Sequence, residues 1–204
     1  MERSLARYRS RYENEIERLI GAAMAVMTDQ QTGDPKVGDI LRAAGLSTKA
    51  FYRHFPTKED LLIAIIERKR QTTSLYIEKK MKDLDDPIER IEAWVRALFD
   101  AVRHPKDLSQ NRPLLLAHPR LLQTFPTEMR AGFDEAILPL SAAIREARRQ
   151  KGLPAGDSGL DARLAMQQVY AVLVESAAQD LPPGQDLIES VVAYTVRAAA
   201  GSVT

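Results

Sequence analysis

Cationic, hydroxyl and aromatic side chains are concentrated in a short stretch that follows Gly45. At helical spacing they share an outward face, and side chains of these types bind phosphates and the edges of bases in protein–DNA complexes. The members of this face are Ser47, Thr48, Lys49, Tyr52, Arg53 and His54. The sequence therefore predicts a DNA-binding surface, although a helix face that merely meets solvent would show the same residues at Tyr52, Arg53 and His54.

The elements that must position this face are indicated by the residues around it. Gly45 follows a short apolar-periodic segment and suits the positive φ that often ends a helix. Ser47 is a strong N-cap, so we expect a new helix there. Phe51 and Phe55 are four residues apart and can anchor that helix to a core. Two helices joined by such a turn form a helix-turn-helix, whose second helix enters the major groove of DNA.

A further helix is expected to begin at Thr57. Pro56 prevents a clean continuation of the preceding helix, and Thr57 with Asp60 resembles a capping box. Lys58 then lies at the positive end of the new helix, where a cation is mildly unfavourable unless an anion approaches. We therefore expect Lys58 to bind a phosphate.

Three runs in this region together resemble the signature of the tetracycline-repressor (TetR) family of bacterial regulators. They are Ala44–Ser47, Phe51–Tyr52 and Phe55–Leu62, and the resemblance extends over roughly residues 12–70. It implies an all-α fold with an N-terminal three-helix DNA-binding domain and a C-terminal helical domain for ligand binding and dimerisation. It also implies that Tyr52 packs along the DNA backbone, that Lys58 binds phosphate, and that a small molecule weakens the binding of a near-palindromic operator.

The start of the second helix departs from the family pattern. Lys36 stands where the family usually has a threonine that contacts phosphate, and a lysine could replace it as a point charge. Asp34–Pro35 is expected to supply the N-cap and the first residue of this helix. The first helix is expected over Tyr12–Thr28.

Arginines are frequent in the first eleven residues, at Arg3, Arg7, Arg9 and Arg11. A basic arm of this kind can neutralise phosphates or enter a minor groove. A frayed, solvated terminus is the alternative interpretation.

Composition limits the class of protein. The chain has 204 residues, a formal net charge of +1 and no cysteine, which excludes disulfides and thiolate metal sites. No apolar run approaches the roughly 18 residues that a membrane-spanning helix needs. We therefore expect a cytoplasmic protein that requires no membrane and no cofactor.

The apolar spacing predicts helices throughout, about nine in all. We expect a DNA-binding domain over residues 1–56, a linking helix over 57–82, and a second domain over 83–204. Pro113 and Pro119 are expected to bracket a short helix, Pro126 to interrupt the next one, and Pro139 to kink it.

The last two helices, expected over residues 160–178 and 186–200, are apolar on more than one face. A second copy of the chain could cover the extra face, and in the resemblance two such helices from each subunit form a four-helix bundle. A homodimer is the prediction, and a monomer that buries these faces in its own core is the alternative.

The second domain is the natural place for an effector cavity. Ordinary core packing is the alternative at each position that could line it, and an apolar organic ligand suits the residue types. The candidates are Trp94, Leu98, Leu115, His118, Leu122, Met129, Phe133, Met166 and Tyr170.

Two other classes of protein compete with a regulator. For an enzyme, the three histidines lie in unrelated segments without partners at motif spacing, and no phosphate loop or nucleophile motif is present. A helical small-molecule carrier or interaction protein that has lost DNA binding is the other alternative. The retention of Tyr52, Arg53 and Lys58 argues against it.

Overall fold

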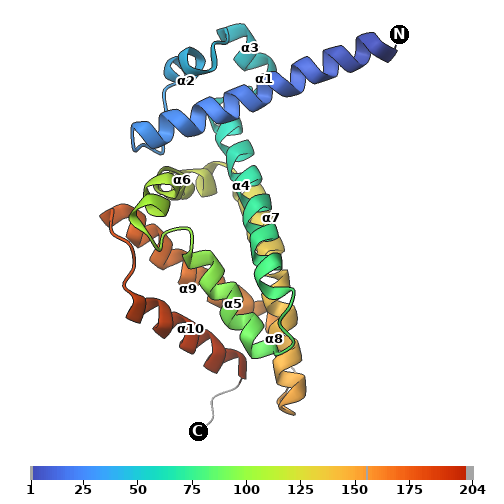
Figure 1. Cartoon of the computed structure of the whole chain (residues 1–204), viewed down its shortest axis with the longest axis vertical. Helices are drawn as coiled ribbons and strands as arrows, with labels where there is room; N and C mark the ends of the chain where they lie inside the picture. The colour runs from blue at the N-terminus through green and yellow to red at the C-terminus, as the bar shows by residue number, and fades with distance from the viewer. Residues whose placement is uncertain (1, 155, 201–204) are drawn as a thin grey trace.

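The computed structural model describes residues 2–154 and 156–200, without the side chains of residues 2–11 and 200. All regular structure in this part of the chain is helical, as predicted (Figure 1). The helices are α1 (Glu2–Asp29), α2 (Val37–Ala44), α3 (Thr48–His54), α4 (Lys58–Met81), α5 (Pro87–Phe99), α6 (Pro105–Thr124), α7 (Pro126–Ala136), α8 (Leu138–Gln150), α9 (Ser158–Gln179) and α10 (Gln185–Ala200).

Three helices, α1 to α3, lie at one end of the molecule, and α4 leads from them toward the remaining helices (Figure 1). One hydrophobic cluster joins residues of α1 to α4, among them Leu19, Ile40, Phe51 and Leu61. A second cluster is built from α4, α5, α6 and α8 to α10, with Trp94 fully buried in it. Both clusters include residues of α6. Ala117 and Leu121 belong to the first cluster, and Leu108 belongs to the second.

The predicted helix boundaries around α3 are confirmed. Gly45 ends α2 at φ +60°, a conformation that costs glycine little. The Ser47 hydroxyl accepts a hydrogen bond from the Ala50 N–H at 3.2 Å. Thr57 and Asp60 form the capping box at the start of α4.

The start of α2 differs from the prediction. Lys36, not Asp34, occupies the N-cap position, and its side chain makes no capping hydrogen bond. Asp34 is turned away because its carboxylate accepts hydrogen bonds from Lys58 and Arg120 instead.

At the N-terminus, α1 begins at Glu2 rather than Tyr12. The side chains of Arg3, Arg7, Arg9 and Arg11 lie outside the described residues, so the basic arm stays a prediction.

The prediction that Pro113 and Pro119 bracket a short helix was wrong, because α6 runs through both. A proline has no N–H, so Pro113 leaves the carbonyl oxygen of Ser109 without its helical partner. The Gln31 side-chain amide donates to that oxygen at 3.2 Å. A residue of the α1–α2 loop therefore replaces a hydrogen bond that the helix lacks.

There are also ten helices in the described part rather than about nine.

The same loop is held against α6 by two arginines. Arg112 donates to the Gln31 carbonyl at 3.5 Å, and Arg120 donates to the Gly33 carbonyl at 3.3 Å. The backbones approach so closely that a Cβ on Gly33 would lie 2.7 Å from the Ala117 nitrogen and 2.8 Å from the Pro113 oxygen. Only glycine fits here without moving the backbone.

We predict that Gly33→Ala destabilises the protein by roughly 1–3 kcal/mol, the usual cost of overpacking. Gly21→Ala is the matched control, because a Cβ there meets nothing within 4 Å and alanine favours a helix. Thermal unfolding should show a lower Tm for Gly33→Ala and an equal or higher Tm for Gly21→Ala. Equal stability of both variants would show that the loop does not rest tightly on α6.

Candidate nucleic-acid interface and internal cavity

The outer face of α3 is exposed where the sequence pattern predicts it. Ser47, Thr48 and Lys49 in and before its first turn are exposed, and Tyr52 is 54% exposed. On the opposite face Phe51 is fully buried and its ring lies 5.2 Å from that of Tyr52. Burial of Phe51 thus holds a polar and aromatic surface outward.

The last turn of α3 is tied to α1 through Glu15. This buried carboxylate accepts a hydrogen bond from Arg53 and lies 2.7 Å from the His54 Nε2. The side chain of His54 is 0% exposed, and the Tyr12 ring lies 4.2 Å from its ring. His54 is therefore not available to DNA, which corrects the prediction for this residue, whereas Arg53 is paired but 45% exposed.

The two partners also change the acidity of Glu15. The hydrogen bond from His54, then that from Arg53, lowers the pKa of Glu15 from its ordinary 4.5 to about 2. Glu15 is thus ionised at any neutral pH, and it fixes the end of α3 with a charge.

Lys58, in the first turn of α4, forms an ion pair with Asp34, and Arg120 of α6 binds the same carboxylate. The hydrogen bond from Lys58, then that from Arg120, lowers the pKa of Asp34. Lys36 is exposed nearby in sequence. Lys58 is consequently not a free cation in this structure. Its partner Asp34 is also paired with Arg120.

A cavity of about 210 Å³ lies between α4, α5, α6, α7 and α9, and apolar side chains form most of its wall. Seven of the nine predicted candidates line it: Leu98, Leu115, His118, Met129, Phe133, Met166 and Tyr170. The other two do not. Trp94 is core, with its indole N–H donating to the Ala136 carbonyl at 3.2 Å. Leu122 lies in the last turn of α6, 43% exposed.

Sequence reasoning missed the contribution of α4 to this cavity. Ile63, Ile66, Arg70, Thr73 and Ile77 line it, and they recur at intervals of three or four residues. That spacing was a usable signal for a second buried face. The interpretation of α4 as only a linking helix concealed it.

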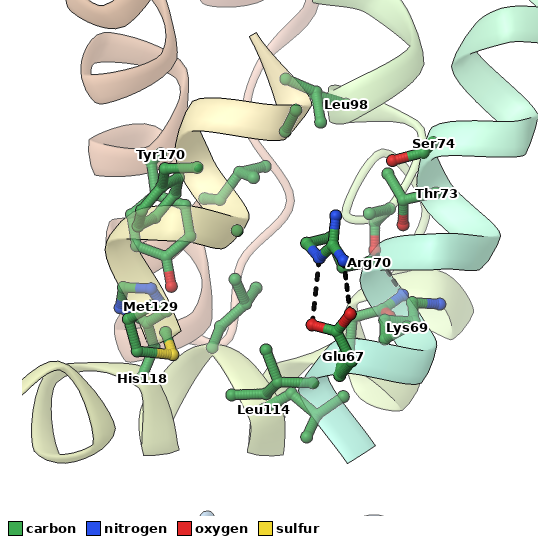
Figure 2. Close-up of a pocket in the computed structure, with 18 of the residues that line it drawn as sticks. Glu67, Lys69, Arg70, Thr73, Ser74, Leu98, Leu114, His118, Met129 and Tyr170 are labelled. Atoms are coloured by element: carbon green, nitrogen blue, oxygen red, sulfur yellow. Dashed lines mark hydrogen bonds and ion pairs between the residues drawn. The ribbon is translucent and has the colours of Figure 1, made fainter. Parts of the chain in front are cut away.

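The cavity has two different sides (Figure 2). On one side Arg70 is paired with Glu67, and Arg70 also forms an ion pair with Glu135 of α7. On the other side Tyr170, His118 and Met129 come together. The rings of His118 and Tyr170 are 4.3 Å apart, and Phe133 lies 5.3 Å from each.

Exposed apolar side chains mark α9 and α10. On α9, Leu160 and Leu164 are exposed and share a face with the exposed Ala171 and Ala178. α10 forms one outer edge of the molecule (Figure 1). Its Leu187 and Tyr194 side chains are exposed. Exposed apolar residues thus recur along two neighbouring helices.

Comparison with known proteins agrees with the helix-turn-helix. Residues 19–65 match the family model described as bacterial regulatory proteins, tetR family. This helix-turn-helix segment belongs to the TetR family. The matched segment runs from Leu19 of α1 to Ile65 of α4 and so includes α2 and α3.

HTH-type transcriptional regulators resemble larger parts of the chain. The transcriptional regulator YwcC of Bacillus subtilis is 29% identical over 102 residues, which are 50% of this chain and 44% of that protein. EthR of Mycolicibacterium smegmatis is 21% identical over 169 residues, 81% of this chain and 76% of that protein. The chain thus spans less than half the length of YwcC.

Solved TetR-like structures share the whole fold. FadR of Bacillus halodurans, a fatty acid degradation regulator, has a TM-score of 0.69 at 19% identity and covers 93% of this chain and 96% of its own. RolR in complex with resorcinol has a TM-score of 0.65 at 21% identity, covering 95% and 91%. At these identities the likeness concerns the fold. No helix in the described part of this chain is long and apolar enough to cross a membrane.

We predict that Glu15→Gln weakens folding in a pH-dependent way. Because the folded-state pKa is lowered, the carboxylate stabilises the protein above pH 4.5, and this contribution is lost as pH falls toward about 2. Urea unfolding should show a stability gap between wild type and variant at neutral pH that narrows through this window. Glu17→Gln, which loses only an exposed pair with Arg68, is the control. A gap that is constant with pH would contradict the assignment.

Proposed function

We propose that this TetR-family chain is a sequence-specific DNA-binding regulator, a repressor whose affinity for its operator is lowered by an apolar small molecule in the cavity. The observation that carries the proposal is the outward face of α3. Thr48, Lys49 and Tyr52 are exposed on a helix whose opposite face is buried. A helix presented in this way fits the major groove.

The exposed residues divide by role. Thr48 and Lys49 lie in the first turn of α3, where contacts to base edges concentrate, so they and Arg53 are assigned to sequence preference. Tyr52, Ser47, Lys36 and Lys58 are assigned to the phosphate backbone. Arg53 reaches DNA only with its exposed part, because Glu15 holds it.

Lys58 would have to exchange Asp34 for a phosphate. The exchange is not prohibitive, because Arg120 remains beside the carboxylate when Lys58 leaves. Salt-dependent neutralisation of phosphate by a lysine then follows the usual release of counterions.

A ligand in the cavity would reach the DNA-binding end through α6. Leu115 and His118 of this helix line the cavity, while Arg112 and Arg120 hold the α1–α2 loop. A ligand that binds better to one position of α6 shifts the population toward it. The domain division at residues 56 and 83 is part of this proposal, and α6, like α4, packs against both parts.

A homodimer completes the proposal. The exposed apolar residues of α9 and α10 would pair two chains, and two α3 helices would then meet half-sites about one DNA turn, ~34 Å, apart. A near-palindromic operator follows from the two-fold symmetry. A mass near the 22.8 kDa of one chain in sedimentation equilibrium would contradict the dimer.

The test uses DNA selected from genomic fragments with purified protein. We predict that Lys58→Ala weakens binding to all sequences alike and reduces the salt slope of log K by about one unit. Lys49→Ala should change the preferred bases instead. Lys79→Ala, an exposed lysine near the other end of α4, is the matched control and should alter neither property.

An unchanged salt slope for Lys58→Ala would remove its phosphate assignment. An unchanged sequence preference for Lys49→Ala would remove the assignment of α3 as the reading helix. Failure of the wild-type protein to select any fragment would favour the alternative, a helical carrier or interaction protein.

A further inference from the structure

His118 carries an unusual polar atom in an apolar cavity. The residue is only 8% exposed, and its Nε2 has no hydrogen-bonding partner among the described residues. A buried polar atom without a partner costs free energy, commonly more than a satisfied one contributes. His118 lines the cavity, so a ligand can supply the missing partner.

The surroundings of His118 are uncharged. Burial lowers the pKa of His118 to about 4, so the imidazole is neutral at physiological pH. Burial also raises the pKa of Tyr170, so its phenol stays protonated. Phe133 completes the cluster with an apolar ring. An ion placed at this end would lose its hydration without gaining a counterion.

The charged groups of the cavity wall are either close to an opposite charge or exposed, and Glu128 of α7 is the exposed one. Arg70 is bound by Glu67 and Glu135, and Figure 2 shows it on the side opposite Tyr170 and His118. Burial lowers the pKa of Lys69, and the nearby charge of Asp107 opposes this shift. The Asn111 amide donates to the Ala101 and Asp107 carbonyls at 2.9 Å each. At the aromatic end of the cavity, His118 therefore has the buried polar atom that is still without a hydrogen-bonding partner among the described residues.

The size of the cavity limits the ligand. A cavity of roughly 150 Å³ is enough for benzene. The volume here is about 210 Å³. It therefore suits a molecule somewhat larger than one benzene ring. A hydroxyl group fits the His118 Nε2 in either tautomer of the neutral ring, since a hydroxyl both donates and accepts.

We propose that the effector is a compact, uncharged aromatic alcohol or phenol, with its ring against Phe133 and Tyr170 and its hydroxyl bonded to the Nε2 of His118. This assignment rests on the proposed role of the cavity as the effector site, and it adds the chemical class of the ligand. The selectivity comes from the orphaned nitrogen, and the exclusion of acids comes from the neutral surroundings.

Three matched probes test the assignment by calorimetry on the DNA-free protein: 4-propylphenol, propylbenzene and 4-propylbenzoate. We expect the phenol to bind about tenfold more tightly than propylbenzene, and the benzoate to bind most weakly. His118→Phe keeps an aromatic ring but removes the nitrogen, so it should reduce the affinity for the phenol to that for the hydrocarbon. Leu122→Ala, an exposed position on the same helix, is the control and should change nothing.

A second readout does not depend on the variant. The ring nitrogens of His118 in ¹⁵N-labelled wild-type protein should shift with 4-propylphenol and not with propylbenzene. Equal affinity for phenol and hydrocarbon, tighter binding of the benzoate, or no binding of any probe overturns the assignment, as does an unchanged His118 signal.

The regulatory proposal is tested separately by adding 4-propylphenol to the protein–DNA complex. His118-dependent binding of the phenol without release of DNA would leave the ligand class standing and remove the effector role. Release of DNA by propylbenzene as strong as that by the phenol would leave the effector role standing and remove the ligand class.

Discussion

The structure depends on holding a helix of seven residues in one orientation. α3 runs only from Thr48 to His54, and a helix this short is not stable on its own in water. Its position must come from tertiary contacts. Phe51 supplies the apolar contact from one side, and Glu15 of α1 supplies a charged contact at the last turn through Arg53 and His54. The buried contacts of α3 thus determine which of its faces is exposed.

The second constraint is the contact between the α1–α2 loop and α6. Pro113 removes a backbone donor from α6, Gln31 replaces it, and the absence of a side chain at Gly33 lets the two backbones meet. Asp34 extends this contact to Lys58 at the start of α4. The loop between α1 and α2 thus contacts both α6 and the start of α4. One helix consequently has a face toward the cavity and a face toward the DNA-binding end.

Local signals in the sequence predicted the elements around α3 well. A glycine at positive φ, a serine N-cap and a capping box each depend on residues within one turn, and all three are present. Apolar and amphipathic residue types on the helices expected to enclose a cavity likewise gave nine candidates, of which seven line it. Long-range partners were beyond this reasoning. Nothing in the neighbourhood of His54 or Asp34 shows that Glu15 or Arg120 lies beside it in space.

The treatment of proline and of α4 failed for related reasons. A proline within a helix is costly when its freed carbonyl stays unpaired, and the partner of the Ser109 carbonyl comes from 78 residues away in the chain. The charged residues of α4 obscured a buried stripe, since Arg70 reaches the cavity wall only with its charge neutralised by glutamates from two helices. In both cases a residue distant in the sequence determines the local structure, and the spacing of residues along the chain does not identify that residue.

The chain has no cysteine, so a single one can carry a cleavage reagent to a chosen position. An iron–chelate cleavage reagent attached to Thr48→Cys at the start of α3 should cut selected operator DNA in two clusters, about one helical turn apart. The same reagent on Leu122→Cys should leave the DNA intact. Cleavage from position 48 that is absent, or no different from that at position 122, would contradict the placement of α3 in the groove.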